Sequence, residues 1–128
     1  MVSRLRHMLI ALVCRLHHYL HLHHKRLHQS AAKAWCTFDA SSGTPTILDN
    51  INVTSLTDTS TGTQDVNFVN SFNNTSYTTN ATVGQGGNKN AVYDNTATSS
   101  VEIKTETATT GADADFNHVS VAHHGDLA

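Results

Sequence analysis

The chain has little of several things that define common protein classes. Its 128 residues include one proline, two cysteines, 6% aromatic and 14% charged residues. Two cysteines are too few for a disulfide scaffold, and one proline excludes a collagen-like chain. The longest apolar run, Met8 to Cys14, is far shorter than the roughly twenty residues that a membrane-spanning helix needs. The length leaves room for one ordinary domain rather than a multi-domain enzyme.

Acidic residues are missing from residues 1–30, whereas the rest of the chain contains all ten of them. The first segment instead holds five of the eight Lys and Arg residues and seven of the ten histidines. Residues 31–128 therefore have three basic and ten acidic side chains, a net charge of −7. We predict a basic, His-rich leader over residues 1–30 and a separate domain over 31–128. A domain of this charge repels a phosphate backbone, so we expect no nucleic-acid partner.

The leader repeats apolar residues at helical spacing, which predicts a short helix. This spacing is shown by Leu5, Leu9, Leu12, Leu16 and Tyr19. Three interpretations stay open: an assembly or interfacial helix, a secretion signal, or a segment ahead of the true start of translation. The leader's histidines have no acidic residue beside them, so we expect no resident metal and no cofactor. The oxidation states of Cys14 and Cys36, which form no CxxC motif, stay undecided.

Threonine and asparagine set the character of residues 31–128, with 18 and 11 copies. Threonine suits a half-exposed strand, and asparagine tolerates the backbone of tight turns. Short stretches of alternating apolar and polar residues are separated by turn signals, with no helical period. We predict an all-β fold, a small antiparallel, jelly-roll-like β-sandwich of about eight short strands. The expected strands include residues 34–39, 47–53, 66–72, 77–83, 91–93, 101–105 and 119–123, with a polar turn over 57–62.

The expected interior is small for a domain of this length. Each fully buried apolar side chain contributes about 1.5–3 kcal/mol, while ordering each residue costs roughly 1–2 kcal/mol of backbone entropy. The thin margin predicts self-association, in which other copies complete the core. The expected core residues are Phe38, Ile47, Ile51, Val53, Leu56, Val66, Phe68, Phe72, Val83, Val101, Ile103, Val119 and Val121.

Residues 32–126 resemble a domain found at the C-terminal ends of bacteriophage tail-fibre and related virion proteins, especially those of marine phages. The resemblance rests on AAKAWCTFDASSGTPTILDNINVTSLTDTSTGTQDVNF, SSVEIKT and VSVAHHGD. It implies a non-enzymatic virion structural protein, a knob near the host-facing tip. It also implies a homotrimer that contacts other virion proteins and a host surface glycan or outer-membrane protein.

Two departures from the family pattern bear on this inference. Cys36 and the pair His123–His124 stand where the relatives have apolar residues. His123 continues the face of Val119 and Val121, so we expect it to point inward. A buried imidazole needs a partner for each ring nitrogen. We therefore expect His123 to lie at a subunit boundary, or at an edge that differs from the relatives.

Six residues are candidate contacts with another subunit or a receptor. Trp35 and Tyr77 are suited to stack on a sugar ring. Trp35 falls on the strand face opposite the core, which favours a subunit interface more strongly. The glycine-rich segment 84–88 predicts an exposed tip where contacts with a receptor would form. The six are Trp35, Tyr77, Gln85, Asn88, His123 and His124.

Paired carboxylates are the nearest approach to a catalytic pattern. Glu102 and Glu106, like Asp113 and Asp115, are evenly spaced and share a strand face. A glycosidase also needs a cleft with one carboxyl in an apolar pocket, which a Thr-rich strand face does not predict. A cation loop that adds Asn117 would lack several of the oxygens that calcium requires. We therefore expect no enzymatic activity.

Two other functions stay open beside the tail-fibre interpretation. One is a capsid-decorating protein that uses the sandwich as a clamp. The other is a secreted or surface-attached carbohydrate-binding module, with the leader as its signal or anchor. A mature N-terminus near Ala31 would favour the carbohydrate-binding module.

Overall fold

The computed structural model describes residues 13–16, 31–84 and 86–128. The chain divides into two units, Met1–Ala31 and Ala32–Ala128. In the first unit, residues 13–16 form one helical turn with exposed side chains. The rest of the predicted leader helix lies outside the described residues. Within the described part, no helix has the length and apolar character to cross a membrane.

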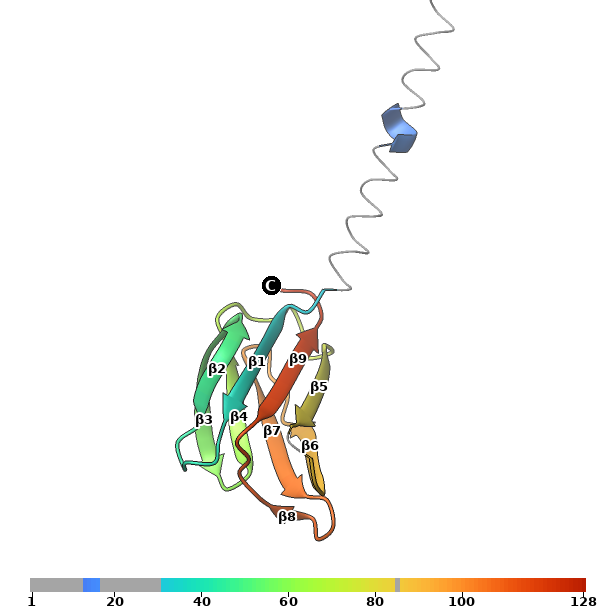
Figure 1. Cartoon of the computed structure of the whole chain (residues 1–128). Coiled ribbons are helices and arrows are strands. Elements are labelled where there is room, and N and C mark those ends of the chain that lie inside the picture. The colour runs from blue at the N-terminus through green and yellow to red at the C-terminus, as the bar shows by residue number, and fades with distance from the viewer. Residues whose placement is uncertain (1–12, 17–30, 85) are drawn as a thin grey trace, which may run out of the picture. The chain divides into compact units, whose positions relative to one another are not determined.

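The second unit is a two-layered β-sandwich, which confirms the predicted all-β fold (Figure 1). Sheet A has the strand order β2-β1-β9-β5, and sheet B has the order β3-β4-β7-β6 with β8 paired to β7. All of these pairings are antiparallel. The strands are β1 (Ala34–Asp39), β2 (Thr46–Ile51), β3 (Val53–Ser60), β4 (Thr63–Phe68), β5 (Thr78–Val83), β6 (Lys89–Asp94), β7 (Ser100–Thr107), β8 (Ala112–Asp113) and β9 (Val119–His124).

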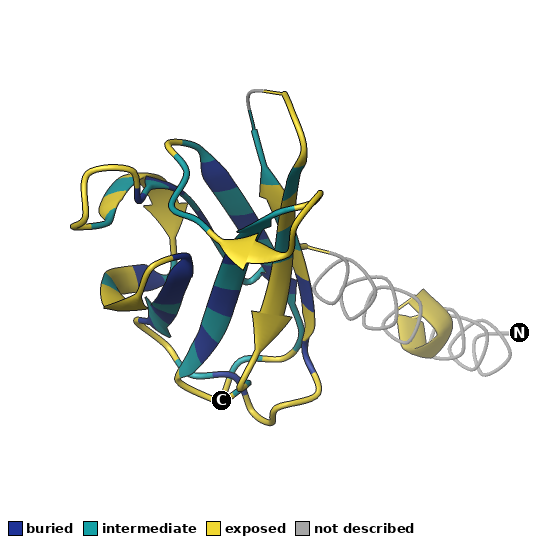
Figure 2. Cartoon of the chain, turned by 90° about the horizontal axis from the view of Figure 1, so that it is seen from below, coloured by how far each residue is buried: buried dark blue, intermediate teal, exposed yellow. Residues whose placement is uncertain are grey.

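Burial alternates along β1, β7 and β9, as the period-two pattern predicts (Figure 2). These strands lie inside their sheets, so each presents one face to the core and the other to solvent. The edge strands β2 and β3 are mostly exposed. The core therefore lies between the central strands of the two sheets.

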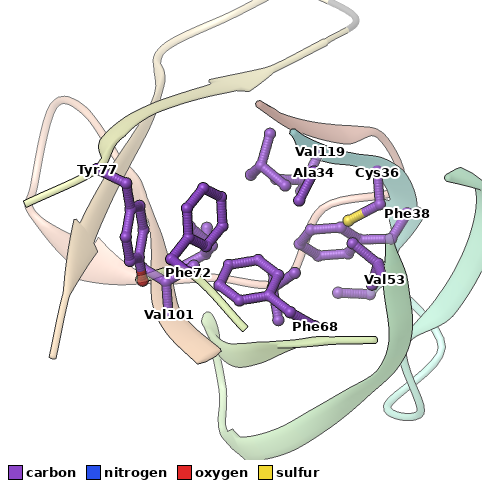
Figure 3. Close-up of a cluster of buried hydrophobic side chains, with 13 residues drawn as sticks. Ala34, Cys36, Phe38, Val53, Phe68, Phe72, Tyr77, Val101 and Val119 are labelled. Carbon is purple, nitrogen blue, oxygen red and sulfur yellow. The ribbon is translucent and has the colours of Figure 1, made fainter. Parts of the chain in front are cut away.

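Aromatic rings fill one end of this core (Figure 3). Phe72 and Tyr77 stack with their centroids 4.3 Å apart, and Phe68 meets Phe72 edge to face at 5.0 Å. Large rings bury much apolar area for each ordered residue, which matters in a small domain. The buried apolar residues are Ala34, Cys36, Phe38, Ala40, Val53, Val66, Phe68, Phe72, Tyr77, Val101, Ile103, Val119 and Val121.

The prediction of one strand over residues 47–53 is wrong, because the chain changes sheet at Asn52. Asn52 adopts a left-handed backbone with φ of 57°, and its side-chain oxygen accepts the backbone N–H of Asn70 at 2.7 Å. This corner separates β2 in sheet A from β3 in sheet B. Ile51 is 54% exposed, whereas Val53 is buried. The two residues do not share a face, and Ile51 does not belong to the core.

The predicted polar turn over residues 57–62 is much shorter in the structure. Strand β3 continues to Ser60, and only Thr61 and Gly62 connect it to β4. Gly62 has the predicted left-handed backbone, with φ of 70°. Its carbonyl oxygen accepts the backbone N–H of Thr105 at 2.7 Å, and a Cβ at Gly62 would collide with the Thr105 carbonyl. Only glycine fits this turn without distortion.

Candidate functional site

The outward side of sheet A carries the chain's single tryptophan. On β1, Ala34 and Cys36 are buried, and Trp35 between them is half-buried and faces away from the core. Its register partners are Ile51 on β2 and Ala122 on β9. Partners in adjacent antiparallel strands have their Cβ atoms roughly 5 Å apart. The indole is therefore flanked by an exposed apolar side chain on one side and a small one on the other.

A row of polar side chains runs across sheet A beside the row formed by Ile51, Trp35 and Ala122. Thr37 Oγ1 and Ser120 Oγ are hydrogen-bonded at 3.2 Å, and Asp49 and Thr82 extend the row to the two edge strands. Residues two apart on a strand are roughly 7 Å apart, so the polar row lies within the reach of one sugar ring. We call this surface the Trp35 face. It consists of Trp35, Thr37, Asp49, Ile51, Asn80, Thr82, Ser120 and Ala122.

The Trp35 face combines an aromatic platform with hydroxyl, amide and carboxylate groups. An aromatic ring stacks on the apolar side of a pyranose, and the neighbouring oxygens hydrogen-bond to sugar hydroxyls. The same composition also suits a protein interface, since tryptophan is enriched at the centres of interfaces. The arrangement is thus chemically suited to binding.

Tyr77 does not contribute to any such surface, so its prediction as a sugar-stacking residue is wrong. Its ring is buried among Phe68 and Phe72, and its hydroxyl donates to the carbonyl oxygens of Ala97 and Ser100 at 2.9 and 3.0 Å. Burial raises the pKa of Tyr77 to about 12. Tyr77 is an even number of residues from the inward-facing Thr79 of β5, which explains its direction. Its hydroxyl bonds hold the segment between β6 and β7 in place.

His123 points into the core, as its parity with Val119 and Val121 predicts, and it is fully buried. Its candidate role as a contact residue is therefore wrong. Its Nδ1 hydrogen-bonds to Thr79 Oγ1 at 3.0 Å, while Nε2 has no partner among the described residues. Burial lowers the pKa of His123 to about 4, and the neighbouring His124 adds to this effect.

The other predicted contact residues fall in two places. His124 is half-buried and pairs with Thr78, which places it on the outer side of sheet A, two residues along β9 from Ala122. Asn88 is exposed in the β5–β6 loop, and its carbonyl oxygen accepts the backbone N–H of Ala108 at 2.9 Å. Gln85 lies outside the described residues.

The first pair of carboxylates is engaged by neighbours on the outer side of sheet B. Lys104 Nζ lies 3.2 Å from Glu102 and 2.9 Å from Asp94. Glu106 accepts a hydrogen bond from Asn90 at 2.8 Å. Each carboxylate thus has a cross-strand or same-strand partner, an arrangement typical of a solvated strand face.

The two residues of the second pair, Asp113 and Asp115, have different surroundings. Asp113 is exposed on β8. Asp115 accepts hydrogen bonds from the backbone N–H of Gly62 at 2.7 Å and from Gln64 Nε2 at 3.1 Å. Among the described residues, no three or more His, Cys, Asp or Glu side chains are placed to hold a metal ion. Asp115 therefore secures the β3–β4 turn.

The sequence predicted the outward direction of Trp35 but not its register partners Ile51 and Ala122. The alternation along β1 is a local signal, whereas the neighbours depend on the register between strands 16 and more residues apart. No family model matches the chain, and it matches neither a curated protein nor a solved structure.

Proposed function

We propose that residues 31–128 form a non-enzymatic structural domain of a bacteriophage virion, of the tail-fibre or knob type. The domain associates with copies of itself, with a trimer as the expected assembly, and binds a host surface ligand. The observation that carries this proposal is the outward position of Trp35 beside Ile51. Further support comes from the sequence blocks that resemble virion proteins, which include Trp35 itself.

Support for self-association comes from the edge strands. Leu48 and Ile51 on β2 are each 54% exposed, and Tyr93 on β6 is 50% exposed. Strands at sheet edges present unpaired backbone groups, and exposed apolar side chains beside them favour association. Contacts of this kind would add apolar burial to a domain whose own core is small.

Light scattering on the full chain after size-exclusion chromatography tests the assembly. We expect a mass about three times the 13.9 kDa of one chain. The variant Ile51→Lys places a charge beside Trp35 and is expected to shift the protein toward monomer. Val69→Lys is the matched control, because Val69 is also exposed but lies outside the strands. A monomer at all concentrations would contradict the proposal.

Ligand binding is tested on an array of host-type glycans and on host outer-membrane protein. We expect Trp35→Ala to abolish binding, because stacking on the indole is lost. Val92→Ala, on the exposed face of sheet B, is expected to bind like the parent chain. The assembly state of both variants is measured in parallel, so that loss of binding is separated from loss of association.

A carbohydrate-binding module outside a virion is the second candidate, because the Trp35 face suits a sugar equally well. The mature protein distinguishes the two. A chain that begins near Ala31 in the culture medium supports a secreted module, whereas an intact chain that co-purifies with phage particles supports the virion domain. Particles that carry the chain on the capsid shell rather than the tail would indicate a decoration protein instead.

A further inference from the structure

Two segments close one end of the sandwich beside the aromatic part of the core. Residues 69–77 connect β4 to β5, and residues 125–128 follow β9 and cross this connection. We call the two segments together the closure. Their mutual backbone contacts are Asn73 N to Asp126 O at 2.8 Å, Ala128 N to Ser71 O at 2.9 Å, and the bridge between Phe72 and Leu127.

His123 lies directly inside this closure. Its ring centroid is 6.5 Å from that of Phe72 and 6.0 Å from that of Tyr77, both edge to face. Phe68 on β4 meets it from the opposite sheet at 5.1 Å. Within the closure, Gly125 packs so tightly against residues 69–77 that a Cβ there would come within 2.7 Å of Tyr77 Cβ. The imidazole is thus covered by side chains that belong mostly to the closure.

The site accommodates a neutral imidazole and not a charged one. Thr79 satisfies Nδ1, but Nε2 faces no acceptor among the described residues. Protonation would place a positive charge and an unpartnered N–H in an apolar enclosure of aromatic rings. A buried charge without a partner costs several kcal/mol, so the protonated ring requires access to water.

We propose that His123 makes the closure pH-sensitive: when the imidazole is protonated, residues 69–77 and 125–128 separate and admit water, while the two sheets stay paired. The reason for a local opening is the difference in attachment. Strand β9 is paired along its length with β1 on one side and β5 on the other. The closure is joined by few backbone bonds, so it opens at lower free energy than the sheet.

Other titratable groups belong to the elements that pack around the ring, and their effects have to be distinguished from that of His123. Burial raises the pKa values of Cys36 and Tyr77 to about 12, so neither changes its charge between pH 7 and 4. His124 and Asp126 are the groups that require controls. The elements around the ring contribute Lys33 before β1, Cys36 on β1, Tyr77 and Asp126 in the closure, His124 on β9, and the uncharged Phe68 on β4 and Thr79 on β5.

Amide hydrogen exchange followed by NMR on the full chain tests the proposal. The reporters are the amides of Asn73 and Ala128, and the reference is Thr105, which bonds across sheet B to Gly62. With a pKa near 6.5 when open and about 4 when closed, the opening constant rises roughly 50-fold between pH 7 and 4.5. We expect reporter protection to fall by this factor and to stay below that of Thr105 at both pH values, because the closure opens without unfolding of sheet B.

Variants assign the effect to its source. His123→Leu keeps the side-chain volume and is expected to remove the pH dependence of the reporters. His124→Gln and Asp126→Asn are expected to retain it. If His123→Leu does not fold, the parent chain alone tests the proposal. The loss of reporter protection must begin near pH 6.5 and level off at the lower pH at which the His123 ring titrates by NMR. Reporter protection equal to that of Thr105 at both pH values, unchanged pH dependence in His123→Leu, or no loss at the reporters would each overturn the proposal.

Discussion

Asp115 holds the turn at Gly62 from 53 residues away: its Oδ1 accepts the Gly62 backbone N–H at 2.7 Å. The same oxygen accepts Gln64 Nε2 at 3.1 Å. Gln64 is fully buried, and its Oε1 has no partner among the described residues. One carboxylate thus satisfies two donors at the β3–β4 turn that would otherwise be left without an acceptor.

Replacing this carboxylate should be costly. We expect Asp115→Ala to lower the free energy of unfolding by about 2–3 kcal/mol, because a charge-assisted bond is lost and Gln64 becomes wholly unsatisfied. Urea denaturation measures the change. Asp113→Ala, two residues away and exposed, is the control and should stay within about 0.5 kcal/mol of the parent. Equal effects of the two substitutions would contradict the structural role of Asp115.

The turn itself requires glycine for two reasons that can be separated. Gly62→Ala meets both an unfavourable positive φ and the Thr105 carbonyl, whereas Gly43→Ala meets a positive φ of 76° in open space. Positive φ alone costs an alanine about 1 kcal/mol. We therefore expect Gly43→Ala to cost about that much and Gly62→Ala at least twice as much. Thermal denaturation of the pair would show a smaller difference if the β3–β4 turn shifts freely.

Protonation of His123 should make global stability depend on pH. Its pKa is about 4 in the folded chain against an ordinary 6.5. Between these values the unfolded chain binds more protons, so stability falls as the pH is lowered from about 6.5 to 4, by up to about 3 kcal/mol. The partly buried Asp65, with its pKa raised by burial and then by Glu102, acts in the opposite direction.

Urea denaturation at pH 7.5 and pH 4.5 measures the dependence on His123. The difference between the two pH values should be smaller in His123→Leu than in the parent chain by most of that amount. If the two proteins lose the same stability on acidification, other groups cause the loss.

Trp35 should matter more for binding than for folding. Trp35→Ala removes cross-strand packing with Ile51 on an exposed face, which we expect to cost about 1 kcal/mol. Phe38→Ala, on the buried side of the same strand, should cost about 3–5 kcal/mol. Denaturation of the two variants tests the assignment, and a Trp35 effect as large as that of Phe38 would place the indole within the folding core.

The sequence predicted the features that depend on local alternation. The inward direction of His123 and the outward direction of Trp35 follow from parity alone. Features set by the backbone of a single residue were harder to find. At Asn52, which has a left-handed backbone, the chain passes from one sheet to the other in the middle of an apolar stretch. Ile51 and Val53 therefore lie on different faces despite their even spacing.

Features set by the pairing of distant strands were beyond local patterns. Tyr77 shares the alternation of β5, but its burial depends on Phe68 and Phe72 meeting it from other segments. The flanking of Trp35 by Ile51 and Ala122 likewise depends on the register of β2 and β9. A single sequence records which way a side chain faces more clearly than what it meets there.

Strand β9 lies between β1 and β5, so these two strands do not belong to one continuous sheet until residues 119–124 are in place. During synthesis on a ribosome, β1 and β5 would therefore emerge long before the strand that joins them. The pairing of β1 with β9 spans most of the domain's length, a topology that slows folding and leaves strand edges unpaired meanwhile. We therefore expect any product truncated before β9 to be prone to aggregate, because the edges of β1 and β5 stay unpaired.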